Sequence, residues 1–232
     1  MGDFKEFAPQ VGKIVTISPF HSMHFSSVYG IKDTITVDLP VRTKDYVIPE
    51  KKTPNRLIFC SVPDRGLEEL AQIYPTIKKE IPDASLTITS DYRLWGVPNA
   101  GNERFIQRFL GTDGVRFLGA VSREQMIHEQ LVADVQAYPC TYDELFCYSV
   151  AECQTAGAYP ITTSQGALET TNMGTKVERN KNGWNSIVGE AIISILKDPN
   201  LPAMQNELRS RAMERFSLSR ILPQWEKVFD ND

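Results

Sequence analysis

Short apolar segments alternate with longer amphipathic ones from residue 55 to the end of the chain. The apolar segments have the length of β-strands, and the segments between them repeat hydrophobic residues at helical spacing. Strands are predicted at residues 56–60, 85–89, 115–118, 133–138 and 158–163. Because strand–helix–strand units join by right-handed crossovers, this alternation predicts an α/β fold with a parallel sheet covered by helices on both faces.

The helices expected between and after these strands have sequence signals of their own. Leu67, Leu70 and Ile73 line one side of an amphipathic segment, and the stretch that begins at Ser122 has the form of an N-terminal capping box. The last third of the chain is predicted to be a helical C-terminal segment. Helices are predicted at residues 66–80, 101–110, 146–156, 184–197, 202–214 and 219–229.

Residues 1–50 follow a different pattern. Strands are predicted at 13–18 and 35–39 with a short helix at 21–29 between them, and prolines interrupt the polar stretch that follows. We therefore expect two parts. The first part ends in a linker, and residues 51–232 form the main domain.

The composition excludes several classes of protein. The 232 residues carry a net charge of −4 and include 41% hydrophobic residues, which is typical of a globular protein and argues against a nucleic-acid surface. No apolar segment is long enough to predict a transmembrane helix. The four cysteines form no CxxC pair, so no metal site is expected, and buried thiols indicate a reducing compartment such as the cytoplasm.

Glu144 and Glu152 bracket the join between a predicted strand and the helix predicted at 146–156. In open α/β sheets, ligands bind beyond the C-terminal ends of the strands. A carboxylate there accepts hydrogen bonds from sugar or ribose hydroxyls, and a helix that begins near Phe146 offers backbone NH groups to a diphosphate. The alternative is that Glu144 is an ordinary charge at a helix N-terminus and that Glu152 is a solvated surface residue.

Three further candidate ligands follow other strand ends. Arg65 stands at a helix start, where a positive charge opposes the helix dipole unless an anion lies nearby. Glu169 follows the segment 164–167, whose small residues permit close approach of a ligand, and Arg93 follows the strand at 85–89. The alternatives are an exposed Arg65 paired with a neighbouring acid, a helix-capping role for Glu169 and a packed aromatic loop around Arg93.

The segment from Glu144 to Pro160 resembles the E-x7-E element of retaining GT-B glycosyltransferases. Seven residues separate Glu144 from Glu152, and the second glutamate stands in the run Ala-Glu-Cys-Gln-Thr-Ala-Gly-Ala-Tyr-Pro. The similarity is closest to the group 1, family 4-like enzymes, which include sucrose synthase-like and lipopolysaccharide mannosyltransferase-like proteins. It covers about residues 55–230 and includes Arg65-Gly66, Val115–Gly119, Tyr138-Pro139 and Gly166–Glu169.

The resemblance implies a Rossmann-like donor-binding domain, preceded in residues 1–50 by a remnant of an otherwise missing N-terminal acceptor domain. It implies retaining transfer of a hexosyl group from a nucleoside-diphosphate sugar to a glycan, lipid or small-molecule acceptor, with no cofactor and no metal. By position, Glu144 is the catalytic residue at the donor sugar, and Glu152 contacts the ribose. The remaining donor-binding positions are Arg65, Gly66, Phe146 and Cys147 for the diphosphate, Gly119 for the base, and Arg93 and Glu169.

The chain departs from the family pattern at one cation. The family places a second basic residue near the end of the first strand of this domain, where the sequence has Phe59-Cys60-Ser61, and Arg93 is a candidate substitute. The isolated chain is expected to transfer poorly, and a non-catalytic nucleotide-binding or interaction module is an alternative. An epimerase would need a histidine near the acidic loop, and a phosphorylase would need a well-placed cofactor lysine. The nucleotide base, the sugar and the acceptor are left open.

Overall fold

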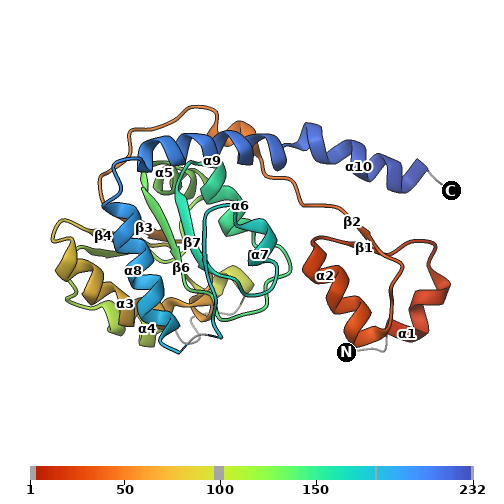
Figure 1. The fold of residues 1–232 in the computed structure, drawn as a ribbon, viewed down its shortest axis with the longest axis horizontal. Coiled ribbons are helices and arrows are strands. Elements are labelled where there is room, and N and C mark those ends of the chain that lie inside the picture. Colours follow the sequence, from red (N-terminus) through yellow and green to blue (C-terminus); the bar gives the residue numbers. More distant parts are fainter. Residues whose placement is uncertain (1–3, 97–101, 181, 231–232) are drawn as a thin grey trace.

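A six-stranded parallel sheet forms the centre of the protein, in the order β5-β4-β3-β6-β7-β8 (Figure 1). The computed structural model describes residues 4–96, 102–180 and 182–230. The predicted α/β fold is confirmed. The strands are β3 (Arg56–Phe59), β4 (Ser85–Ile88), β5 (Val115–Phe117), β6 (Val135–Tyr138), β7 (Tyr159–Thr163) and β8 (Thr175–Val177).

Helices cover both faces of this sheet because its central strands are apolar on both sides. Leu57 and Phe59 of β3 pack with α3, α4 and α8 on one face, whereas Ile58 and Cys60 pack with α5 and α6 on the other. Helix α9 lies along α6 (Figure 1). These helices are α3 (Leu67–Glu80), α4 (Asn102–Phe109), α5 (Arg123–Val132), α6 (Tyr148–Thr155), α8 (Trp184–Leu196) and α9 (Leu201–Arg215).

The chain reverses its direction of travel across the sheet at β3. It runs outward from β3 through β4 to β5, and then returns to β6 on the other side of β3. The loops that follow the neighbouring strands β3 and β6 therefore leave the same edge of the sheet, one leading toward β4 and the other toward β7. This is the switch point at which open α/β sheets bind ligands.

The N-terminal residues form a small unit of their own beside the main sheet (Figure 1). Strands β1 (Val15–Thr16) and β2 (Ile35–Thr36) pair in parallel, and α1 (Phe4–Phe7) and α2 (Pro19–His24) belong to the same unit. The C-terminal helix α10 (Leu218–Asp230) leaves the main sheet and packs its Ile221 and Val228 against Val37 and Val15 of this region. The boundary near residue 50 stays a prediction.

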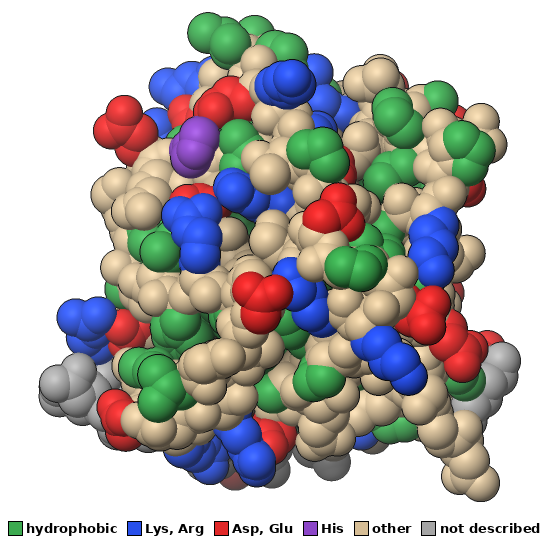
Figure 2. Space-filling model, turned by 90° about the vertical axis from the view of Figure 1, so that its left-hand side faces the viewer, with side chains coloured by type: hydrophobic (Ala, Val, Ile, Leu, Met, Phe, Trp, Pro, Cys, Tyr) green, Lys and Arg blue, Asp and Glu red, His purple; other side chains and the backbone are tan. Residues whose placement is uncertain are grey.

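The fold differs from expectation at several places, including α1, α7 (Leu168–Thr171), β8 and the start of α6. Strand β8 was not predicted, because it is three residues long and carries Lys176 at an exposed position. Helix α6 begins at Tyr148 and not near Phe146. In the described parts of the chain, none of the helices combines the length and the apolar character that crossing a membrane requires. On the face drawn in Figure 2, basic and acidic side chains are interspersed.

Candidate active site

Arg65 and Glu144 meet at the switch point. Arg65 ends a 3-10 turn (Pro63–Arg65) after β3, and Glu144 lies in the loop after β6. Arg65 Nε lies 3.3 Å from Glu144 Oε1, and the two side chains are only 11% and 16% exposed. The Arg65 guanidinium also stacks 3.4 Å above the centre of the Tyr142 ring and lies 3.6 Å from Asp64. The alternative of an exposed arginine is therefore wrong, although Arg65 does pair with the neighbouring Asp64.

The hydroxyl of the buried Tyr138 holds the Glu144 carboxylate as well. The Tyr138 hydroxyl donates a hydrogen bond of 2.8 Å to Glu144 Oε1. Burial raises the pKa of Tyr138 well above its usual value, so the hydroxyl keeps its proton near neutral pH. Glu144 is thus oriented by one cation and one hydroxyl, and its second oxygen remains available for a ligand that donates hydrogen bonds.

Two glycines bring the loops of the site into backbone contact. Gly66 has φ +109°, and a Cβ there would lie 2.4 Å from the carbonyl oxygen of Pro139. Gly166 has φ +59°, and a Cβ there would lie 2.7 Å from the backbone of Glu144. Ala167 N donates to Glu144 O at 2.7 Å. The loops after β3, β6 and β7 therefore pack against one another with no side chain between them.

The N-terminus of α6 lies just beyond Glu144 along the chain. Cys147 caps the helix with φ +74°, a left-handed conformation that costs free energy for any residue other than glycine. Phe146 is 2% exposed, and its ring packs edge-on against the rings of Tyr148 and Phe216. The Phe146 side chain is thus part of the core. The first turn of α6 leaves backbone NH groups without partners in the helix, as an anion site requires.

Glu152 lies on α6 one turn after Tyr148, and a network of side chains holds its carboxylate. Arg123 Nη1 lies 2.6 Å from Oε1, and Gln130 Nε2 donates to Oε2 at 3.4 Å. The Glu152 side chain is 18% exposed, so the alternative of a solvated surface residue is wrong. The sequence signal at Ser122 located the start of α5 but did not indicate that Arg123 and Gln130 point toward α6.

Gly119 and Arg93 lie together at the ends of β5 and β4, apart from the Arg65–Glu144 pair. A cavity of about 460 Å³ opens there, lined among others by Ser90, Asp91, Arg93, Phe117 and Gly119. Arg93 pairs with Asp91 at 2.5 Å and holds the pKa of that carboxyl well below its usual range. Arg93 is therefore engaged by a neighbouring carboxylate. The alternative of a packed aromatic loop is seen in part, because the Tyr92 ring beside Arg93 lies 6.2 Å from the ring of Phe105.

Glu169 lies at the other side of the site, in the short helix α7 (Leu168–Thr171). Its carboxylate is 58% exposed and pairs with Lys176 of β8 at 3.1 Å. A cation that the sequence analysis missed lies closer to the acidic loop. Arg179 Nη1 donates to Thr141 O at 3.0 Å and to Gln165 Oε1 at 3.1 Å. No pattern in the sequence marks Arg179, because it follows the unpredicted strand β8.

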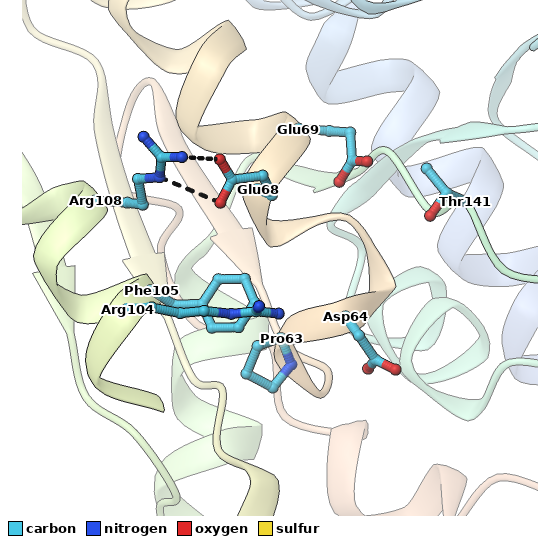
Figure 3. Close-up of a pocket in the computed structure, with 8 residues that line it drawn as sticks. All are labelled: Pro63, Asp64, Glu68, Glu69, Arg104, Phe105, Arg108 and Thr141. Carbon is cyan, nitrogen blue, oxygen red and sulfur yellow. Dashed lines mark hydrogen bonds and ion pairs between the residues drawn. The ribbon is translucent and has the colours of Figure 1, made fainter. Parts of the chain in front are cut away.

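A second cavity of about 430 Å³ lies beside the loop after β3, between α3 and α4 (Figure 3). Figure 3 shows Arg108 paired with Glu68, and Arg104 lying against the ring of Phe105. Asp64, Glu68 and Glu69 all contribute carboxylates to the lining. Three acids do not favour a phosphate, so this cavity fits a diphosphate less well than the Arg65 corner does. Among the residues that the structure describes, no cluster of histidine, cysteine and carboxylate side chains could hold a metal ion.

Known structures share this fold. The glycosyltransferase of Rickettsia africae ESF-5 is 18% identical, with a TM-score of 0.79 over 98% of this chain and 66% of its own. The sucrose-phosphate synthase of Thermosynechococcus elongatus is 18% identical, with a TM-score of 0.78 over 97% and 59%. Anabaena HepE, solved with UDP and glucose, is 16% identical, with a TM-score of 0.76 over 96% and 64%. The chain thus spans about three fifths to two thirds of each relative.

These likenesses establish the GT-B fold. A search of curated proteins found no significant match to the chain. The sequence family described as glycosyl transferases group 1 matches residues 43–215, which include β3 to β8 and both glutamates. This match covers well over half of the chain, and the chain therefore belongs to the group 1 family of glycosyl transferases.

Proposed function

We propose that the chain is the donor-binding domain of a retaining glycosyltransferase that takes a hexosyl group from a nucleoside-diphosphate sugar. The observation that carries this proposal is the Arg65–Glu144 pair at the switch point between β3 and β6. A nearly buried guanidinium stacked on an aromatic ring is already held in place for a phosphate group. The UDP and glucose bound to Anabaena HepE support a nucleotide sugar as the ligand.

Six of the predicted positions receive a role in this proposal. Arg65 and the backbone at Phe146 and Cys147 stabilise the negative charge that develops on the leaving diphosphate. Glu144 accepts hydrogen bonds from the donor sugar and acts as the catalytic residue. The ribose lies at Glu152, and the base lies in the cavity at Gly119. Because arginine and the helix N-terminus supply the positive charge, the proposed reaction uses neither a metal ion nor a cofactor.

The acceptor side belongs to a second domain in this proposal. The relatives are longer than this chain, which supports an acceptor domain that these residues do not contain. Closure of two domains over the donor excludes water, so we expect transfer by the isolated chain to be slow. All four cysteines are buried free thiols, which supports a reducing compartment, and we propose the cytoplasm.

Calorimetric titration of the chain with UDP, GDP, ADP and the matching nucleotide sugars tests the proposal. One nucleoside diphosphate is expected to bind, and the Glu152→Ala variant is expected to bind it more weakly. Glu207→Ala is the matched control, since Glu207 is an exposed helical glutamate on α9. If none of the three diphosphates binds, the donor-domain function is wrong and the interaction module is favoured.

A further inference from the structure

The Glu152 carboxylate belongs to a network of four side chains joined by hydrogen bonds. Glu152 Oε1 lies 2.6 Å from Arg123 Nη1, and Glu152 Oε2 accepts from Gln130 Nε2 at 3.4 Å. Both partners lie on α5, and both bind Tyr46, which comes from the 3-10 turn Thr43–Tyr46 outside that helix. Arg123 Nη2 donates to the Tyr46 hydroxyl at 3.2 Å, and that hydroxyl donates to Gln130 Oε1 at 2.7 Å. We refer to these four residues as the Tyr46–Glu152 network.

Tyr46 is the most firmly held member of this network. It is fully buried and ends the 3-10 turn Thr43–Tyr46, which lies in the segment that leads from β2 to β3. Its carbonyl oxygen accepts a hydrogen bond of 2.5 Å from Arg209 of α9. Its hydroxyl donates to Gln130 and accepts from Arg123, so the two hydrogen bonds form at the same time without competing. A position held this tightly can fix the more mobile side chains around it.

The geometry points to a function for this network: we propose that the Tyr46 hydroxyl is a positioning group that holds Glu152 ready for the ribose. The inference rests on the proposed function, in which Glu152 binds ribose. A carboxylate has about four lone-pair sites, and Arg123 and Gln130 use two of them. The other two lone-pair sites of the Glu152 carboxylate are used by neither Arg123 nor Gln130, and in this proposal they accept hydrogen bonds from the two ribose hydroxyls. Tyr46 itself does not touch the nucleotide.

The physical effect of Tyr46 is preorganisation. Without its hydroxyl, the Gln130 amide loses the donor to its carbonyl oxygen, and the Arg123 guanidinium keeps only Glu152 and Asp45 of its three side-chain partners. The carboxylate then samples several orientations, and ordering it on binding costs affinity. The loss is specific to ligands that have ribose hydroxyls. A defect in folding or in the diphosphate site would weaken every nucleotide equally.

Calorimetry with UDP and 2′,3′-dideoxy-UDP, or the same pair of GDP or ADP if that base binds, tests the proposal. Tyr46→Phe removes one hydroxyl and keeps the ring, and we expect it to weaken binding of the ribose nucleotide about 3- to 10-fold. Binding of the dideoxy nucleotide is expected to be unchanged. Tyr74→Phe is the matched control, because Tyr74 is also fully buried and its hydroxyl donates to Ala84 O at 3.1 Å.

A second variant keeps the test independent of any effect of Tyr46→Phe on folding. Arg123→Lys retains the charge at a side chain that is 38% exposed, but lysine cannot bridge Glu152 and Tyr46 with a forked group. It is expected to show the same selective loss for the ribose nucleotide. In a Glu152→Ala background, Tyr46→Phe is expected to have no further effect on affinity.

Distinct outcomes separate this inference from the proposed function. Equal binding of the ribose nucleotide by wild type and Tyr46→Phe overturns the inference, as does an equal loss for the dideoxy nucleotide. Both outcomes leave the donor-domain function in place. Absence of binding by wild-type protein to UDP, GDP and ADP overturns both.

Discussion

Arg65 Nε lies 3.3 Å from Glu144 Oε1, across the gap between the loops that follow β3 and β6. The two residues are far apart in sequence, and each lies next to a glycine contact that allows its loop to approach the other. The pair places a cation and a carboxylate at one point. In the proposed function, a diphosphate shares Arg65 with Glu144 and Asp64, and the strength of these two ion pairs then affects the affinity for the diphosphate.

Replacing Arg65 with alanine should weaken binding of the nucleoside diphosphate at least about 10-fold, because a charge-assisted hydrogen bond is lost and Glu144 is left without its cation. Isothermal titration calorimetry gives the change in Kd. Arg108→Ala is the matched control, since Arg108 is an exposed arginine paired with Glu68 outside the site. A change of less than about 2-fold in the Arg65 variant would mean that the diphosphate lies elsewhere.

Gly166→Ala should lower the free energy of unfolding more than Gly183→Ala does. Both positions have positive φ, at +59° and +76°, so alanine costs about 1–2 kcal/mol at each. Only at Gly166 would the new Cβ also lie 2.7 Å from the backbone of Glu144, whereas nothing lies within 4 Å at Gly183. Urea denaturation measures the difference, and displacement of Glu144 should also weaken nucleotide binding. Equal losses of stability in the two variants would show that the loop around Glu144 moves away from the new Cβ without a cost in free energy.

Phe146→Leu should destabilise the protein by about 1–2 kcal/mol and leave nucleotide affinity almost unchanged, because only the backbone of residue 146 faces the site. Its ring packs at 89° against Phe216 with centroids 5.9 Å apart, so Phe216→Leu should produce a similar loss of stability. Thermal unfolding and calorimetry on both variants separate the two effects. A large loss of affinity at full stability would contradict the assignment of this side chain to the core.

Burial lowers the pKa of Lys52 to about 8, although its ammonium donates to Ala156 O at 3.1 Å. A lysine with a depressed folded pKa favours folding above its unfolded pKa, and this contribution is lost as pH falls through the folded pKa. Between pH 7 and 9.5 the unfolded chain keeps the proton and the folded chain releases it, so stability should rise with pH.

The comparison with Lys52→Met isolates this contribution from the tyrosines that also titrate at high pH. Denaturant unfolding of both proteins across this window should show the wild type gaining about 1–2 kcal/mol relative to the variant, after allowance for partial exposure. Parallel pH profiles of the two proteins would show that Lys52 remains protonated in the folded state.

Several strands and helices were predictable because the spacing of hydrophobic residues along the chain reflects which side chains are buried. The apolar segments at 56–60 and 133–138 became β3 and β6, whose side chains alternate between two covered faces. Strand β8 was not predicted, because an edge strand of three residues is too short to show a periodic pattern of hydrophobic residues. The start of α6 was misplaced because Phe146 contributes to the core through tertiary contacts with Phe216, while Cys147 adopts a left-handed conformation.

The sequence by itself determined the order along the chain of β3 to β7 and the long helices, and thus which residues follow the C-terminal ends of those strands. It placed Arg65, Glu144 and Gly119 at strand ends, since local patterns of burial and turn formation need no knowledge of distant residues. Only the tertiary structure decided their partners. Arg65 meets Glu144, Arg93 meets Asp91, and Glu152 meets Arg123, because side-chain contacts depend on which strands and helices become neighbours and how closely the loops pack.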